Sequence, residues 1–183
     1  MSEIKTIGVV GAGQMGNGIA HVAAQAGLGV VMHDLEDAFV ERGLGAIAKN
    51  LQRGVDKGRM SAEDKDATLA RVTGTTDLDA FAECDFAVEA VVENLDVKTD
   101  LFGRLDRICR DGVILATNTS SISITKIASA TGRPERVIGM HFMNPVPVMK
   151  LVEVIRGLGT SDQTTREVLD LAARMGKTAV ECR

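Results

Sequence analysis

Two residues in the last third of the chain have the side chains and spacing of an acid–base pair. His141 lies in an apolar segment, residues 136–142, and Glu153 lies within a second one, residues 149–155. Period-two alternation makes both faces of the second segment otherwise apolar, so the Glu153 carboxylate needs a partner there. Residues 144–147 read NPVP, a stiff turn that can bring carboxylate and imidazole together. The pair is then either a general base or a structural pair that stabilises the turn.

Further polar side chains follow predicted strands. Ser120 comes after a strand at residues 112–116, where it either caps the next helix or points into a cleft. Glu93 follows a strand at residues 85–92, and the carboxyl ends of parallel strands form the ligand edge of such sheets. Asn144 belongs to the NPVP turn, where asparagine is also a common turn former. Together with the acid–base pair, these residues are the candidates for substrate chemistry.

A glycine-rich segment, GAGQMG at residues 11–16, has the G-x-G-x-x-G spacing of a phosphate-binding loop. Its surroundings agree, because an apolar strand precedes it, a helical pattern follows, and a second apolar strand comes next. Gly11 allows the tight turn, Gly13 the approach of a pyrophosphate, and Gly16 the close packing of helix and strand. The alternative is a glycine-rich turn without a ligand. Cofactor contacts are expected from Gly11, Gly13, Gln14, Met15 and Gly16.

Asp34 ends the second apolar strand and predicts which dinucleotide the loop binds. It lies 23 residues after Gly11, where a carboxylate can accept hydrogen bonds from the adenosine ribose hydroxyls. A 2′-phosphate there would be repelled by the carboxylate. We therefore expect NAD(H) rather than NADP(H).

These residues require a particular scaffold. Strands alternate with helices as far as residue 134, which predicts an α/β fold of the doubly wound Rossmann type with a mostly parallel sheet. No helix fits between segments 136–142 and 149–155, so those two strands are expected to be antiparallel or at an edge. A helix at residues 162–175, capped by Ser161, and a strand at residues 177–182 complete the pattern.

A helix is expected at residues 36–51 after the second strand, with Phe39, Leu44, Ile47, Ala48 and Leu51 pointing inward. It is followed by a charged helical hairpin, residues 51–72, which is expected to stand off the main fold. Ser61 is its predicted internal helix cap. Lys49 and Lys57, near and within the hairpin, either belong to a solvated face or form a basic handle for a phosphorylated substrate.

Three titratable residues lie outside these motifs. His21 is expected on the surface of the first helix, and His33 in a core or edge position. Glu89 is an acid inside a predicted strand and receives no role.

Composition narrows the class of protein. The chain has 183 residues with 45% hydrophobic and 25% charged residues, which is typical of a globular domain. Its net charge of −4 disfavours nucleic-acid binding, and no apolar run has the length of a membrane span. The N-terminus has no signal-peptide pattern, and three widely spaced cysteines predict reduced thiols, no metal site and a cytoplasmic location.

Five motifs in order resemble one enzyme family. GAGQMGNGIA, the acid Asp34, EAVVENLDVK, NTSSISIT and HFMNPVPVMKLVEVI are together similar to the L-3-hydroxyacyl-CoA dehydrogenases. Within that family the short bacterial 3-hydroxybutyryl-CoA dehydrogenases are most similar. The resemblance runs from Ile4 to the end of the chain.

The resemblance implies an NAD-dependent enzyme that reversibly oxidises (3S)-3-hydroxyacyl-CoA to 3-ketoacyl-CoA. His141 matches the family's catalytic base and Glu153 its orienting acid. Ser120 and Asn144 match groups near the nicotinamide and the substrate oxygen, while Glu93 and Lys98 match cofactor contacts. The helical excursion after the second strand is implied to contact coenzyme A.

The resemblance also implies a helical domain, which in the family supplies the dimer interface and part of the substrate cleft. We expect residues 1–183 to form the NAD-binding domain alone, without that helical domain, and to be weakly active. Two alternatives stay open. One is a sugar-acid dehydrogenase of the lambda-crystallin type, and the other is an isolated NAD-binding module with little activity.

Overall fold

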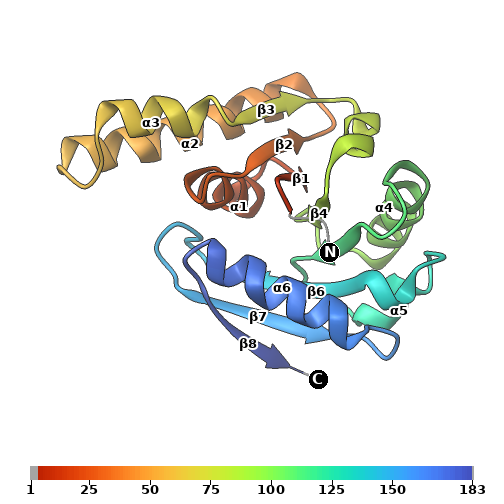
Figure 1. The fold of residues 1–183 in the computed structure, drawn as a ribbon. Helices are drawn as coiled ribbons and strands as arrows, with labels where there is room; N and C mark the ends of the chain where they lie inside the picture. The colour runs from red at the N-terminus through yellow and green to blue at the C-terminus, as the bar shows by residue number, and fades with distance from the viewer. Residues whose placement is uncertain (1–3, 183) are drawn as a thin grey trace.

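The computed structural model describes residues 4–182, whose strands form one eight-stranded sheet in the order β3-β2-β1-β4-β5-β6-β7-β8 (Figure 1). The strands are β1 Thr6–Val10, β2 Gly29–His33, β3 Val72–Thr75, β4 Phe86–Glu89, β5 Ile114–Thr117, β6 Val137–Phe142, β7 Leu151–Arg156 and β8 Thr178–Cys182. Most neighbours pair in parallel, as predicted from the alternating pattern.

The chain reverses its direction of travel across the sheet at β1. It moves from β1 through β2 to β3, then returns to β4 on the other side of β1. Ligands bind at such switch points in doubly wound sheets. The pair β6–β7 is antiparallel, as predicted, but β7 is not an edge strand because β8 pairs with it in parallel.

Helices cover both faces of the sheet. They are α1 Gln14–Gln25, α2 Asp37–Asp56, α3 Ala62–Leu69, α4 Leu95–Ile108, α5 Ile124–Ala128 and α6 Asp162–Arg174, with 3₁₀ turns η1 Leu78–Glu83 and η2 Pro134–Arg136. Side chains of α1, α2 and α6 pack on one face, and those of η1, α4 and α5 on the other. Each fully buried aliphatic side chain contributes about 1.5–3 kcal/mol to this packing.

Short polar residues start several helices as the sequence predicts. Ser61 and Ser161 accept hydrogen bonds from backbone N–H groups of α3 and α6, as predicted. Asp77 likewise accepts from the N–H of Asp79 at the start of η1. The cap of α5 is not Ser120, the residue considered from the sequence, but Ser123, whose side chain accepts from the N–H of Lys126.

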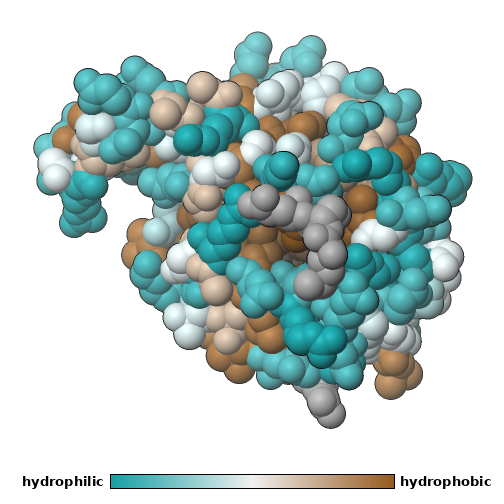
Figure 2. All heavy atoms as spheres, in the orientation of Figure 1, coloured by the Kyte–Doolittle hydropathy of each residue, from teal (hydrophilic) through white to brown (hydrophobic). Residues whose placement is uncertain are grey.

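The predicted helix at residues 36–51 and the first arm of the predicted hairpin form a single helix. Helix α2 is one continuous element that begins at Asp37, and α3 returns beside it (Figure 1). Leu51, the predicted start of the hairpin, is buried on the main core. The exposed Phe39 was predicted to point inward, but the buried stripe of α2 runs through Val40, Gly43, Ile47 and Leu51. The projecting end carries many hydrophilic side chains, at the upper left of Figure 2.

Within residues 4–182, no helix combines the length and apolar character needed to cross a membrane.

Candidate functional site

The glycine-rich loop between β1 and α1 has the predicted conformation. Gly11 has a φ of +102°, and its N–H donates to the carbonyl of His33 at 2.8 Å. A Cβ at Gly16 would lie 1.7 Å from the Gly11 carbonyl oxygen, so only glycine fits there. A Cβ at Gly13 would meet no atom within 4 Å, which leaves the backbone open to a ligand. In the described part of the chain no side chain caps α1, so its first N–H groups face outward as an anion site.

Asp34 is fixed by the loop that it accompanies. Its Oδ2 accepts from the N–H of Ala12 at 2.7 Å, and its Oδ1 accepts from the N–H of Leu35 at 2.8 Å. A carboxylate has about four acceptor positions, so two lone pairs remain for a diol. The hollow beside it, here called the glycine-loop pocket, has a volume of about 620 Å³. The residues lining it include Gly13, Gln14, Asp34, Phe39, Arg42 and Asn50. Phosphate-binding amides and a diol acceptor in one pocket fit a dinucleotide such as NAD.

His141 and Glu153 meet as the spacing predicted. They stand directly opposite each other in the β6–β7 pairing, and His141 Nδ1 lies 2.8 Å from Glu153 Oε2. An ionised carboxylate only accepts, so Nδ1 carries the hydrogen and Nε2 of the neutral ring keeps a free lone pair. Both faces of this strand are otherwise apolar, and the pattern therefore predicts a buried strand around Glu153. That prediction is wrong for one face, because the face that Glu153 shares with Leu151 is partly exposed.

A second pocket, here called the His141 pocket, collects most of the predicted site residues. Its volume is about 310 Å³. It is lined by Met15, Ala90, Val91, Glu93, Lys98, Asn118, Ser120, His141, Phe142, Met143 and Asn144. Glu153 stands behind the imidazole and does not line the pocket. Residues from the glycine loop, from β6 and from the segments after β4 and β5 therefore converge at one edge of the sheet.

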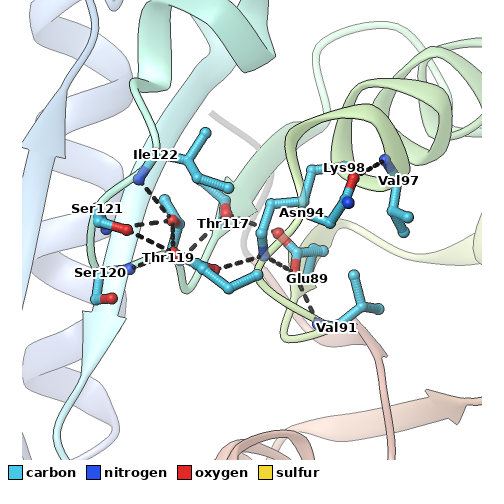
Figure 3. A network of polar contacts seen from close by, with 11 residues as sticks. Glu89, Val91, Asn94, Val97, Lys98, Thr117, Thr119, Ser120, Ser121 and Ile122 are labelled. Atoms are coloured by element: carbon cyan, nitrogen blue, oxygen red, sulfur yellow. Dashed lines mark hydrogen bonds and ion pairs between the residues drawn. The ribbon is translucent and has the colours of Figure 1, made fainter.

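Ser120 and Asn144 are each held in this pocket by a hydrogen bond, Ser120 through its backbone and Asn144 through its side chain. The N–H of Ser120 donates to Oε1 of Glu93 at 3.2 Å, and the Ser120 hydroxyl points away from this contact (Figure 3). Ser120 as a whole is exposed. Gln14 Nε2 donates to Asn144 Oδ1 at 3.3 Å, which joins the glycine loop to the proline turn. Lys49 and Lys57 are elsewhere, exposed on α2 and just after it, so the structure does not bring them to this pocket.

Sequence reasoning missed Asn118 and the buried polar cluster behind Ser120. Asn118 Oδ1 accepts from the N–H of Phe142 at 2.8 Å and ties the end of β5 to β6. Glu89, left without a role, is fully buried and accepts from Lys98 Nζ at 2.5 Å and from Thr117 Oγ1 at 2.7 Å. An acid within a short apolar strand, followed by a lysine one helical turn into the next helix, was the available signal.

The ammonium of Lys98 also lies 3.3 Å from Glu93 Oε2. Burial alone would raise the pKa of Glu93, but a hydrogen bond from Thr119 and the charge of Lys98 together hold it below its usual range. Lys98 was expected to contact the cofactor. That remains a prediction, since its side chain is buried and its ammonium contacts two carboxylates.

The two remaining histidines lie in the core. His33 is buried edge-on to Phe81, with ring centroids 6.2 Å apart, in agreement with the expected core position. The prediction that His21 lies on the helix surface is wrong, because α1 is covered on that side by the turn after β6. Burial, with a smaller effect of the nearby Lys177 charge, lowers the pKa of His21 to about 4. Neither ring is part of a metal-binding group of three or more ligands within the described residues.

Comparison with known proteins places this geometry in context. Residues 6–183 match the family model described as 3-hydroxyacyl-CoA dehydrogenase, NAD binding domain. The chain is 54% identical over 175 residues to a probable 3-hydroxybutyryl-CoA dehydrogenase of Deinococcus radiodurans, covering 96% of this chain and 63% of that protein. A probable 3-hydroxybutyryl-CoA dehydrogenase of Bacillus subtilis is 52% identical over 179 residues, with 98% and 62% covered.

A solved structure has the same fold. The (S)-3-hydroxybutyryl-CoA dehydrogenase of Ralstonia eutropha superposes with a TM-score of 0.96 at 49% identity, over 98% of this chain and 63% of that one. The chain thus spans about three fifths of the length of the relatives that it matches.

Proposed function

This chain belongs to the 3-hydroxyacyl-CoA dehydrogenase family, through the NAD-binding domain of that family, and we propose that it serves the reversible NAD-dependent oxidation of (3S)-3-hydroxyacyl-CoA to 3-ketoacyl-CoA. The observation that carries the proposal is the 2.8 Å contact between His141 Nδ1 and Glu153 Oε2, beside the His141 pocket. The names of the relatives favour 3-hydroxybutyryl-CoA as the substrate.

The dinucleotide is held by the glycine-loop pocket. The N–H groups at the start of α1 bind the pyrophosphate, and Asp34 accepts from the ribose hydroxyls. When bound, NAD⁺ supplies the hydride acceptor for the hydrogen on C3 of the substrate. The contacts proposed for Gly11, Gly13, Gln14, Met15 and Gly16 follow from the position of the loop at this edge.

His141 acts as the general base of the oxidation and as the general acid of the reverse reaction. Its Nε2 lone pair takes the proton of the substrate hydroxyl as C3 becomes a carbonyl carbon, and returns it in the reverse direction. The Glu153 carboxylate fixes the ring and stabilises the imidazolium that forms. General-base assistance of this kind is worth about 10²–10⁴ in rate.

Ser120 and Asn144 hold the reacting oxygen. Ser120 lines the pocket and its backbone N–H donates to Glu93, so the position of the residue is restricted. Asn144 accepts from Gln14 through Oδ1, which leaves its amide nitrogen free to donate to the substrate oxygen. Both would thereby keep the hydroxyl at the distance that proton transfer to His141 requires.

The coenzyme A end of the substrate would lie toward the hairpin of α2 and α3. Lys49 and Lys57 are exposed there and make no ion pair with a described residue. Cationic side chains suit the phosphates of coenzyme A, while a merely solvated face is the alternative. The proposed partners are thus an acyl-CoA and NAD, without nucleic acid or membrane.

We propose the cytoplasm as the compartment. Cys84 and Cys109 are buried free thiols, and burial raises the pKa of both, to about 12 and about 11. Residues 1–183 are proposed to fold as one NAD-binding domain. A homodimer would use a helical domain of the kind that the resemblance implies.

The test is a pair of measurements on the chain of residues 1–183. Calorimetric titration should show binding of NADH in preference to NADPH, and Asp34→Ala should remove about a tenfold preference. Acetoacetyl-CoA should be reduced with NADH, weakly and more readily than L-gulonate is oxidised with NAD⁺. Equal binding of NADH and NADPH by the unaltered chain would contradict the role of Asp34. Oxidation of L-gulonate in place of acyl-CoA turnover would contradict the proposed substrate, and NADH binding without any turnover would identify an isolated binding module.

A further inference from the structure

Glu89 is a fully buried carboxylate at the end of β4, and every contact it makes has a defined donor. Its Oε1 accepts from Lys98 Nζ at 2.5 Å and from the N–H of Val91 at 2.7 Å, while Oε2 accepts from Thr117 Oγ1 at 2.7 Å. An ionised carboxylate is costly to bury unless it is paired and hydrogen-bonded in this way. The arrangement therefore fixes the ends of β4 and β5 and the first turn of α4 relative to one another (Figure 3).

Lys98 connects this buried acid to a second, more accessible one. Its side chain is 1% exposed, and its ammonium lies 3.3 Å from Oε2 of Glu93, whose side chain is 40% exposed. Because Glu89 fixes the ammonium from the protein interior, the charge of Lys98 acts on Glu93 at the surface of the His141 pocket. The lysine is thereby engaged by two carboxylates rather than directed to solvent.

Glu93 organises the segment that carries Ser120, here called the Ser120 loop, residues 118–123. Its Oε1 accepts from the hydroxyl of Thr119, from the N–H of Ser120 at 3.2 Å and from the hydroxyl of Ser121 at 3.3 Å. The Thr119 hydroxyl in turn accepts from the N–H of Ile122 at 3.0 Å. One carboxylate oxygen, Oε1 of Glu93, is thus the common acceptor of the loop.

We propose that Glu89 and Lys98 are a positioning pair for the site: they orient Glu93, and through Glu93 they fix the Ser120 loop and its contacts with cofactor and substrate. The role of Ser120 rests on the proposed function, whereas the ordering of the loop does not. Glu89 does not line the His141 pocket. Lys98 does line it, but its side chain is 1% exposed and its ammonium lies on Glu89 and Glu93, so the pair acts on the Ser120 loop through Glu93.

The test uses the full chain in the absence of cofactor. Either single substitution leaves a buried charge without its partner, so the informative variant is Glu89→Gln combined with Lys98→Met, which removes both charges at similar volume. It should keep a melting temperature close to that of the unaltered chain. Amide hydrogen exchange of Ser120 and Ile122, followed by NMR, should nevertheless accelerate about tenfold, as expected for loss of a charge-assisted hydrogen bond.

Two further variants sharpen the result. Glu93→Gln should accelerate the same amides while Glu89 and Lys98 stay paired. Arg104→Gln, which removes an exposed charge on the same helix, should leave them unchanged. In calorimetry, the double variant should bind NADH about tenfold more weakly.

Exchange in the Ser120 loop that matches the unaltered chain, in a folded double variant, would overturn the proposal. If the loop is loosened but the affinity for NADH is unchanged, the claim that the pair also fixes the contacts between the loop and the cofactor is overturned. Exchange is measured without cofactor, so it tests the positioning pair independently of the proposed function. If the unaltered chain turns over no acyl-CoA, that result counts against the proposed function, while faster exchange in the double variant still supports the positioning pair.

Discussion

Two acid–base pairs stand at the same edge of the sheet, and they differ in exposure more than in geometry. His141 Nδ1 and Glu153 Oε2 are 2.8 Å apart, and their side chains are 20% and 37% exposed. Lys98 Nζ and Glu89 Oε1 are 2.5 Å apart, and their side chains are 1% and 0% exposed. Proton exchange with a substrate requires access, so only the first pair, here called the open pair, is suited to acid–base chemistry. The second, the sealed pair, is suited to fixing geometry.

The position of each strand explains the difference. Glu89 belongs to β4, which lies between β1 and β5 and is covered by helices on both faces, so its side chain has no exposed direction. Glu153 belongs to β7, where the burial alternates along the strand and Glu153 shares a partly exposed face. The position of its strand in the sheet therefore decides whether each carboxylate is accessible, as Glu153 is, or fully buried, as Glu89 is.

Removing the base of the open pair should have the largest effect. His141→Gln should reduce acetoacetyl-CoA turnover by about 10²–10⁴, because proton transfer loses its positioned base. NADH affinity should stay near that of the unaltered chain. Glu153→Gln should also lower turnover, and the double variant should be little worse than the worse single, since the two act as a unit. Multiplicative losses in steady-state assays would show two independent roles.

The same chemical change should affect stability very differently in the two pairs. Glu89→Gln leaves the buried Lys98 ammonium without its main partner and should lower the free energy of unfolding by about 3–5 kcal/mol. Glu153→Gln is the matched control, and for a partly exposed pair the loss should be at most about 1 kcal/mol. Urea unfolding of the two variants side by side gives both values. Equal losses would contradict the distinction between sealed and open pairs.

His21, unlike the accessible imidazole of His141, is buried, and it should make a smaller contribution to the free energy of unfolding that depends on pH. Its pKa is lowered from 6.5 to about 4 by burial and by Lys177, so the unfolded chain binds more protons between those values. Stability should therefore fall as the pH decreases through that window, and the His21 contribution between pH 7 and pH 5 is about 2 kcal/mol. His21→Leu should remove that part of the loss in urea unfolding. An unchanged loss would show that His21 is not the titrating group.

Much of this site could be predicted from local sequence. The glycine loop and Asp34 depend on one β-α-β unit, and the His141–Glu153 pair depends on a turn and a register between neighbouring strands. Local pattern is sufficient for such features because the residues that form them are close along the chain.

What the sequence did not predict depends on packing between distant segments. The buried carboxylate of Glu89 needs a donor from the next strand, Thr117, which the local sequence does not reveal. His21 is buried because the turn after β6 packs on α1. The exposure of Glu153 likewise depends on which side of β7 is covered. The bounds of the hairpin were missed because α2 continues past Leu51 to Asp56 while Leu51 itself packs in the main core.

The most direct test of the division between the two pairs is a calorimetric titration of NADH into two folded variants. The first is His141→Gln, and the second is the Glu89→Gln and Lys98→Met double variant, each compared with the unaltered chain. We predict unchanged affinity in the first and about tenfold weaker affinity in the second, because the sealed pair positions the Ser120 loop and the open pair does not. Weakened binding in His141→Gln together with normal binding in the double variant would contradict this prediction.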